Sequence, residues 1–271
     1  MSGFPAAWLA LREPYDVAAR NEAVLAAVAG VFRGQPSIAI VDLACGTGST
    51  LRAIGRHLPP RQSWRMVDND LGLLLRTSTL GRPPDVSVVT RPIDLARDLE
   101  LALEAPLDLV TVSALLDLVS LEWLERLAIE TAARRLPVYA ALTYDGRAVL
   151  EPGDALDRDM LAAFHAHLRT DKGFGAALGT QAPARAVERF EQVGYAVMQG
   201  RSDWVLEAAD SALQEALFAG WAEPATQTMG AASASGRVGA WLTRRRSHLA
   251  AGRSRLRVGH VDIFARPMGA R

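Results

Sequence analysis

The stretch Ile38–Thr50, which reads I-A-I-V-D-L-A-C-G-T-G-S-T, constrains the fold more than any other part of the sequence. It begins with a short apolar run rich in β-branched residues, which ends at Asp42 and is followed by Gly46 and Gly48. Such a run predicts a buried strand, and residues 51–58 are compatible with a helix. A strand followed by a glycine-rich turn and the N-terminus of a helix presents backbone N–H groups to a ligand.

The spacing of these glycines narrows the class of ligand. A dinucleotide-binding turn has the pattern G-x-G-x-x-G, whose third glycine lets the helix pack on the strand. The sixth residue counted from Gly46 is Leu51, so this pattern fails. An acid before the glycines, Asp42, repels a pyrophosphate and suits a ligand with an ammonium group. A Rossmann-like turn that holds some other nucleotide is the alternative interpretation.

The D-L-A-C-G-T-G sequence resembles motif I of the class I S-adenosylmethionine (SAM) dependent methyltransferases. The resemblance implies SAM as cofactor and S-adenosylhomocysteine as product. It also implies that Asp42 helps to hold the methionine end of SAM, through water or the loop backbone. The loop residues that this resemblance assigns to the cofactor site are Ala44, Cys45, Gly46, Thr47 and Gly48.

The second expected strand, residues 63–67, ends in Asp68-Asn69-Asp70. An acid about twenty residues beyond the glycine turn can accept hydrogen bonds from both ribose hydroxyls, and Asp68 has this position. We therefore assign Asp68, with its neighbour Asn69, to the cofactor site. Asp70 is expected to cap the helix over residues 71–77.

Two further strands are expected at residues 86–90 and 107–113. After the first, Pro92-Ile-Asp-Leu resembles the family position where an acid meets the adenine amino group and an apolar residue packs on the ring, here Asp94 and Leu95. The second adjoins the first strand of the sheet at the point where chain order reverses, so its carboxyl end faces the ligand crevice. Ser113 and the residues up to Asp117 should therefore lie beside the transferable methyl group.

The N-terminal residues 4–30 have apolar positions at helical spacing. A helical segment at this place often lies over the cofactor in the methyltransferase family. Tyr15 and Arg20 are its polar residues that could reach the SAM carboxylate. A solvated arginine and a packed tyrosine are the alternatives, and we place Arg20 in the cofactor site.

Strand and helix alternate between Ile38 and Thr143, which predicts an α/β fold with a doubly wound, mostly parallel sheet. The family resemblance implies seven strands, the last two antiparallel at the edge. We expect one domain over residues 1–271, with an N-terminal helical segment and two insertions. These are residues 1–34, a substrate cap at 151–182, and a helical insertion at 207–252 that extends the cap or provides a homodimer surface.

Methyl transfer from SAM requires positioning of the nucleophile and, where needed, removal of its proton. The candidates for a catalytic base are Asp117, Tyr144, His165 and His167. Histidine has the unperturbed pKa best suited to neutral pH, but the place of Asp117 after the fourth strand is better supported. The two histidines would point to different faces of a helix, and with one cysteine and no third ligand we expect no metal.

Composition excludes several classes of protein. The formal net charge is +0, which argues against a chain-wide nucleic-acid footprint. No apolar run approaches the roughly 18 residues that span a membrane, and the first residues do not resemble a signal peptide. A single cysteine, Cys45, fits a reducing cytoplasm. Lys172 is the only lysine in the sequence, in a loop Asp171-Lys-Gly-Phe-Gly175 that either closes over a ligand or forms a surface hairpin.

Residues 237–271 contain nine arginines against one acid, Asp262. This region leaves open an RNA methyltransferase, although a solvated arginine-rich helix explains it as well. A second alternative is a SAM-binding module without transfer activity. The residues after the fourth strand are Ser113-Ala-Leu-Leu in place of an N-P-P-Y type signature, which disfavours nucleobase amines. Our main hypothesis is transfer to a small-molecule acceptor, whose reacting atom the sequence leaves open.

Overall fold

The computed structural model describes residues 4–78, 83–228 and 234–269. Its centre is an eight-stranded sheet in the order β3-β2-β1-β4-β5-β8-β6, with β7 paired to β8. The strands are β1 (Ser37–Leu43), β2 (Arg61–Asp68), β3 (Val86–Pro92), β4 (Leu109–Ser113), β5 (Val138–Glu151), β6 (Tyr195–Arg201), β7 (Trp204–Leu206) and β8 (Arg255–Pro267).

Strands β1 to β5 are parallel, and β8 runs antiparallel to β5, β6 and β7. Chain order reverses between β1 and β4, which confirms the doubly wound sheet and opens a crevice at the carboxyl ends of these strands. The expected number of seven strands is wrong by one. After β6 the chain stops pairing with β8, because the Asp203 carboxylate accepts hydrogen bonds from Arg147 and from the backbone N–H of His260. The chain then pairs with β8 again as β7.

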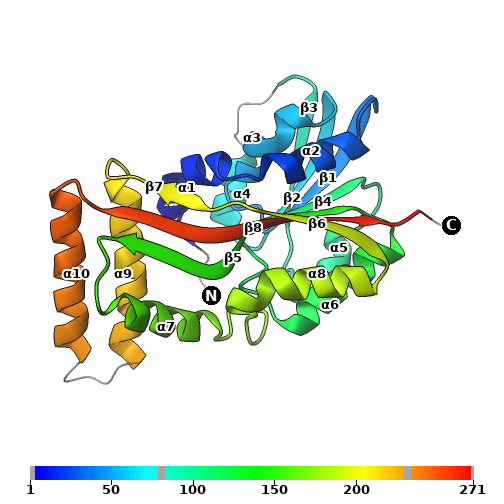
Figure 1. The fold of residues 1–271 in the computed structure, drawn as a ribbon. Coiled ribbons are helices and arrows are strands. Elements are labelled where there is room, and N and C mark those ends of the chain that lie inside the picture. The colour runs from blue at the N-terminus through cyan, green and yellow to red at the C-terminus, as the bar shows by residue number, and fades with distance from the viewer. Residues whose placement is uncertain (1–3, 79–82, 229–233, 270–271) are drawn as a thin grey trace.

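Helices cover both faces of the sheet, and three more stand at one end of it (Figure 1). Among the described residues, no helix combines the length and the apolar character needed to cross a membrane. The helices are α1 (Ala6–Ala18), α2 (Glu22–Val31), α3 (Ser49–Ile54), α4 (Leu71–Ser78), α5 (Leu99–Ala102), α6 (Leu121–Ala133), α7 (Asp157–Leu168), α8 (Ala182–Gln192), α9 (Ser211–Thr228) and α10 (Ala234–Ala250).

The two faces of β1 pack into two separate cores because side chains alternate along a strand. Ile38 and Ile40 are buried in the core that includes Val28 of α2. Val41 and Leu43 are buried in the core that includes α6 and α8. Each such aliphatic side chain stabilises the fold by about 1.5–3 kcal/mol, so both faces fix the position of the loop that follows β1.

A third core lies at the end of the sheet where α7, α9 and α10 stand, and we call these three helices the cap. Strands β5 and β8 are long enough to run from the parallel sheet into this core (Figure 1). The expected alternation of strand and helix ends at Thr143, but β5 continues to Glu151 because it resumes pairing with β8 at residues 148–151, after two register shifts. The first cap helix therefore begins at Asp157, inside the insertion expected at residues 151–182.

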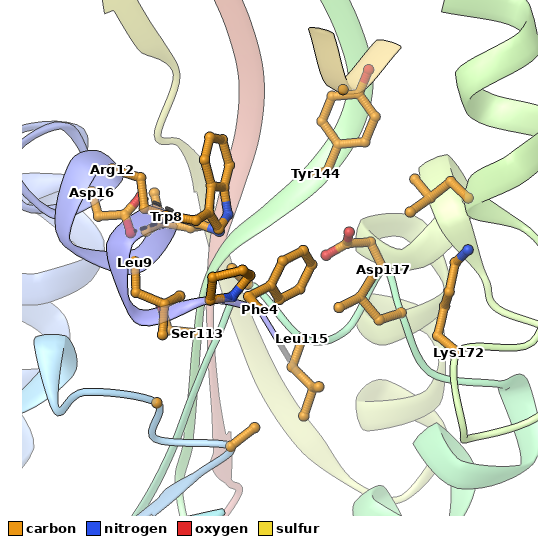
Figure 2. Close-up of a pocket in the computed structure, with 18 of the residues that line it drawn as sticks. Phe4, Trp8, Leu9, Arg12, Asp16, Ser113, Leu115, Asp117, Tyr144 and Lys172 are labelled. Atoms are coloured by element: carbon orange, nitrogen blue, oxygen red, sulfur yellow. Dashed lines mark hydrogen bonds and ion pairs between the residues drawn. The ribbon is translucent and has the colours of Figure 1, made fainter. Parts of the chain in front are cut away.

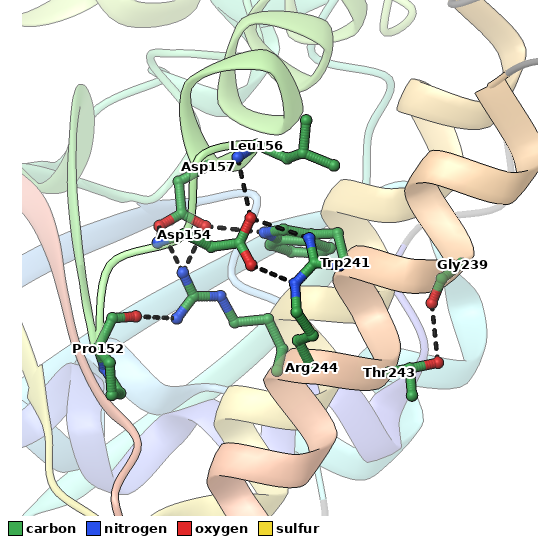
Figure 3. Close-up of polar contacts among 9 residues, drawn as sticks. Pro152, Asp154, Leu156, Asp157, Gly239, Trp241, Thr243 and Arg244 are labelled. Atoms are coloured by element: carbon green, nitrogen blue, oxygen red, sulfur yellow. Dashed lines mark hydrogen bonds and ion pairs between the residues drawn. The ribbon is translucent and has the colours of Figure 1, made fainter.

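Arginines of α10 attach this helix to the start of α7 (Figure 3). Arg245 is fully buried, and its guanidinium is paired with the Asp157 carboxylate. Trp241 donates its indole N–H to the same carboxylate at 2.7 Å. Arg244 binds Asp154 through two hydrogen bonds of 2.5 and 3.0 Å. Part of the arginine-rich region thus holds the cap together.

Candidate functional site

A cavity of about 830 Å³ lies at the carboxyl ends of the strands and extends beneath the cap. Ligand pockets usually measure roughly 300–1,000 Å³, so this cavity is near the upper end of that range. We divide it into two halves by the residues that line it. The strand-end half is lined by Ala44–Thr47, Asp68, Asn69, Asp94, Leu95 and Ser113, and the cap half by Trp8, Asp117, Tyr144, Phe164, Lys172, Trp204, Trp221 and His260.

The glycine-rich loop after β1 forms the floor of the strand-end half. Gly46 and Gly48 have φ angles of +53° and +80°, in the left-handed region that favours glycine. The loop is held by a hydrogen bond from the Thr77 hydroxyl to the Gly46 carbonyl, at 2.9 Å. Leu9 of α1 covers it so closely that a Cβ on Gly46 would lie 3.1 Å from the Leu9 Cδ1. The loop is therefore held by α4 through Thr77 and contacted by α1 through Leu9.

Asp68 stands at the end of β2, on the cavity wall. Its two oxygens accept backbone N–H groups, from Gly46 at 2.9 Å and from Asp70 at 3.0 Å. A carboxylate has about four lone-pair sites, so one acceptor position on each oxygen is left for a ligand diol. The neighbouring Asp70 accepts from Gly72 and Leu73 at the start of α4, which confirms its predicted role as a cap.

Asp42 lies beneath the loop and is fully buried. Burial raises the pKa of its carboxyl to about 7, against the opposing effects of a hydrogen bond from Thr111 and the charge of Arg20. Arg20 is buried as well and donates to the Ser113 hydroxyl at 3.0 Å. Neither Asp42 nor Arg20 lines the cavity, so both can act on a ligand only through the loop or through Ser113.

Nine of the twelve residues predicted for the cofactor site line one continuous surface of the cavity. Three others, Asp42, Gly48 and Arg20, lie behind that surface. Leu95 is buried, and its carbonyl accepts the indole N–H of Trp123 at 2.7 Å, which fixes the loop after β3. The nine lining residues are Ala44, Cys45, Gly46, Thr47, Asp68, Asn69, Asp94, Leu95 and Ser113.

The cap half has walls rich in aromatic side chains, and of these only Tyr144 was predicted as a site residue. They come from α1, β5, α7, β7, α9 and the loop before α8, and the first and last of them, Trp8 and Trp221, are 213 residues apart in the sequence. Each of these segments carries its aromatic residue as an ordinary core position, so the sequence alone does not separate lining from packing. The six principal ones are Trp8, Tyr144, Phe164, Phe174, Trp204 and Trp221.

Asp117 projects into the cap half from the segment after β4, as predicted. Its carboxylate points across the cavity toward Phe4 (Figure 2). The residue is buried, and this burial raises the pKa of its carboxyl to about 6. Hydrogen bonds from the backbone N–H groups of Asp117 and Tyr144 and the charge of Arg12 oppose this shift. With a pKa of about 6, most of this carboxyl group is ionised at pH 7 and above.

The two histidines of α7 point to different sides of the helix, as expected. His167 lines the cavity, and its Nε2 lies 3.1 Å from the Nζ of Lys172, which also donates to Thr170 at 2.9 Å. His165 lies outside the cavity with its Nε2 at 2.8 Å from the Tyr144 hydroxyl. Burial lowers the pKa of both histidines. His165 can therefore act on the cavity only through Tyr144.

His260 of β8 lines the cavity and was not predicted. It is only 5% exposed, and burial lowers its pKa to about 3, so the ring is neutral at physiological pH. Its Nδ1 has no hydrogen-bond partner among the described residues. The ring lies 4.8 Å from that of Trp204. Side chains alternate along β8, and the sequence does not indicate which of them face a cavity.

A network on α1 forms the wall opposite Asp117 (Figure 2). Arg12 donates to the Asp16 carboxylate through two hydrogen bonds of 2.9 and 3.2 Å. The indole N–H of Trp204 donates to the same carboxylate at 3.0 Å. The positive charge of Arg12 is thus paired with Asp16, and α1 is attached to β7.

Strained backbone is found where β4 and β5 meet the cavity. Ala114 and Leu142 both line it and have φ angles of +51° and +53°. The Leu142 N–H is turned out of the ladder and donates to the buried Asp262 carboxylate at 2.8 Å. Such conformations cost about 1–3 kcal/mol each and are concentrated at functional sites.

No protein-family model matches the sequence, and neither does any curated protein. Solved structures do match the fold. A cyclopropane-fatty-acyl-phospholipid synthase-like protein from Lactobacillus casei has a TM-score of 0.54 and 14% identity, over 93% of this chain and 98% of that one. The YcgJ protein from Bacillus subtilis has a TM-score of 0.50 and 11% identity, over 92% of this chain and 100% of that one. The chain has the Rossmann-like fold of the class I methyltransferases.

Proposed function

We propose that this protein transfers the methyl group of SAM to a small-molecule acceptor. One observation carries the proposal: a single cavity connects the strand-end half to the cap half. The first has the glycine loop and the acids expected for SAM, and the second has space for another molecule beside Asp117. The shared methyltransferase fold supports this assignment.

The residues of the strand-end half fit SAM by their chemistry. Gly46, in the left-handed region, lines the cavity without a side chain and so permits close approach of a ligand. The free acceptor positions of Asp68 match a ribose diol. Asp94 lines the same half, and we assign it to the adenine amino group. When bound, SAM supplies an activated methyl group on a positively charged sulfur.

The residues of the cap half would position the acceptor and receive its proton. A methyl transfer requires the nucleophile in line with the breaking bond, so walls that fix the orientation of the acceptor contribute directly to the rate. Asp117 is the ionised group closest in sequence to the end of β4, and it faces the cavity. It is our candidate for the base.

An RNA acceptor has less support from the structure. Besides Arg244 and Arg245, the arginines of α10 include Arg237, paired with Asp159 at 3.1 Å, and Arg246, paired with Glu215 at 2.6 Å. These contacts use the basic side chains within the cap. A SAM-binding module without transfer activity would have no use for the cap half.

Calorimetric titration with SAM and with S-adenosylhomocysteine tests the cofactor. We expect micromolar binding of both by the purified protein. No binding to either, by protein whose circular dichroism shows it to be folded, would overturn the proposal. Transfer of a labelled methyl group to RNA rather than to small molecules, lost when Arg244 and Arg246 are replaced by glutamine, would favour the alternative.

A further inference from the structure

The Asp117 carboxylate is a buried negative charge with no cationic partner in the described part of the chain. It makes no ion pair there, and the one positive charge that acts on it belongs to Arg12, which is already paired with Asp16. Lys172 lines the same cavity but binds His167 and Thr170. A buried charge is costly unless it is paired, so a site of this kind is completed by a cation that arrives with the ligand.

The walls around this carboxylate suit a cation as well. Aromatic faces carry negative potential and attract ammonium groups within about 6 Å, and aromatic cages of this kind recognise alkylated amines. Trp8, Tyr144 and Trp221 line the cap half from three different elements. The Trp204 ring on the same wall already holds a cation, the Arg12 guanidinium, 5.0 Å from its centroid. His260 on the same wall is neutral and therefore does not repel a cation.

We propose that the methyl acceptor is an amine, a basic nitrogen on an apolar body, held as an ammonium group between Asp117 and the aromatic walls. This proposal rests on the proposed function. An acceptor that carries a carboxylate beside the reacting atom would be repelled by Asp117. A neutral hydroxyl compound would leave the Asp117 charge unpaired.

The bound ammonium group loses one proton to the Asp117 carboxylate, which leaves a neutral amine with a lone pair. That lone pair forms the new N–C bond while the C–S bond of the methyl donor breaks and sulfur keeps the bonding electrons. The products are S-adenosylhomocysteine and an N-methylammonium ion, and Asp117 then releases its proton to water.

Binding of three matched indole probes to the complex with S-adenosylhomocysteine tests the proposal. Tryptamine, tryptophol and indole-3-propionate share the apolar body and differ in the group that meets Asp117. We expect tryptamine to bind about 10-fold tighter than tryptophol, and indole-3-propionate to bind least. In Asp117→Asn the preference for tryptamine over tryptophol should disappear. Glu223→Gln, which neutralises an exposed carboxylate of the same cavity, should retain it.

Equal or tighter binding of tryptophol or indole-3-propionate would overturn the amine assignment, as would an amine preference that survives in Asp117→Asn. Absence of binding by all three at millimolar concentration would also overturn it. Because each titration begins from the complex with S-adenosylhomocysteine, these results leave the cofactor assignment intact. Failure to form that complex is the separate result that removes the proposed function.

Discussion

The strand-end half and the cap half of the cavity are built in different ways. The first consists of backbone turns and of residues that directly follow parallel strands, so the sheet itself sets its geometry. The second consists of side chains from α1, α7, α9, β7 and β8, which meet only because the cap packs as a core of its own. The difference indicates that cofactor binding depends on the sheet, whereas acceptor recognition depends on the cap and can change separately.

The largest effect should come from Gly46→Val. A side chain there must adopt a φ of +53° and would meet Leu9, while filling the space above the loop. We expect SAM affinity to fall about 1,000-fold or more, about 4 kcal/mol, as measured by calorimetry. Gly239→Val is the control, because a Cβ on this residue of α10 has no neighbour within 4 Å. Retained SAM binding in Gly46→Val would show that the loop is not the cofactor site.

Arg245→Ala tests whether the cap is energetically separate from the cofactor site. It leaves Asp157 without its buried cation, which should lower the free energy of unfolding by about 3 kcal/mol, the lower end of the usual range since Asp157 is partly exposed. SAM affinity should stay within about 2-fold of the parent protein. Arg246→Ala removes an exposed ion pair instead and should cost less than about 1 kcal/mol. A large loss of SAM affinity in Arg245→Ala would contradict the separation.

Asp68→Ala sharpens the same comparison from the cofactor side. The lost charge-assisted hydrogen bonds should weaken SAM binding by about 1–3 kcal/mol. Asp70→Ala is its matched control two residues away, because this carboxylate caps α4 and contacts the backbone of the helix only. We expect the control to lose about 1 kcal/mol of stability but to keep its SAM affinity. Unchanged affinity in Asp68→Ala would remove this residue from the ribose contact.

Asp117→Asn should make the protein more stable while making it a worse enzyme. Burial raises the pKa of Asp117 from 3.8 to about 6, so the folded state binds its proton more tightly than the unfolded chain does. The contribution of Asp117 to the free energy of unfolding is therefore greatest below pH 4 and is lost as the pH rises through about 6. At pH 7.5 we expect the free energy of unfolding of Asp117→Asn, measured by chemical denaturation, to exceed that of the parent protein by about 1–2 kcal/mol. This difference should become smaller toward pH 4. A loss of stability at pH 7.5 would mean that the carboxylate has a cationic partner in the folded protein.

The strand-end half could be predicted because its signals are local. A glycine turn after a short apolar run, and an acid directly after the next strand, place Gly46 and Asp68 without knowledge of any distant contact. Arg20 could not be placed in the same way, since its burial depends on how α1 and α2 meet the sheet. His260 and Trp204 could not be identified either, because the direction of their side chains depends on the bulges of β5 and the separate pairing of β7.

The sequence contains one cysteine and one lysine, and each lines a different half of the cavity. Cys45 lies in the glycine loop, and Lys172 stands in the loop that follows α7. Burial raises the pKa of the Cys45 thiol and lowers that of the Lys172 ammonium group. The lowered pKa favours reaction of Lys172 with an amine reagent, whereas burial and the raised pKa make the reaction of Cys45 with a thiol reagent slow. Protection of Cys45 would report a bound cofactor, and protection of Lys172 would report a bound acceptor, in the same sample.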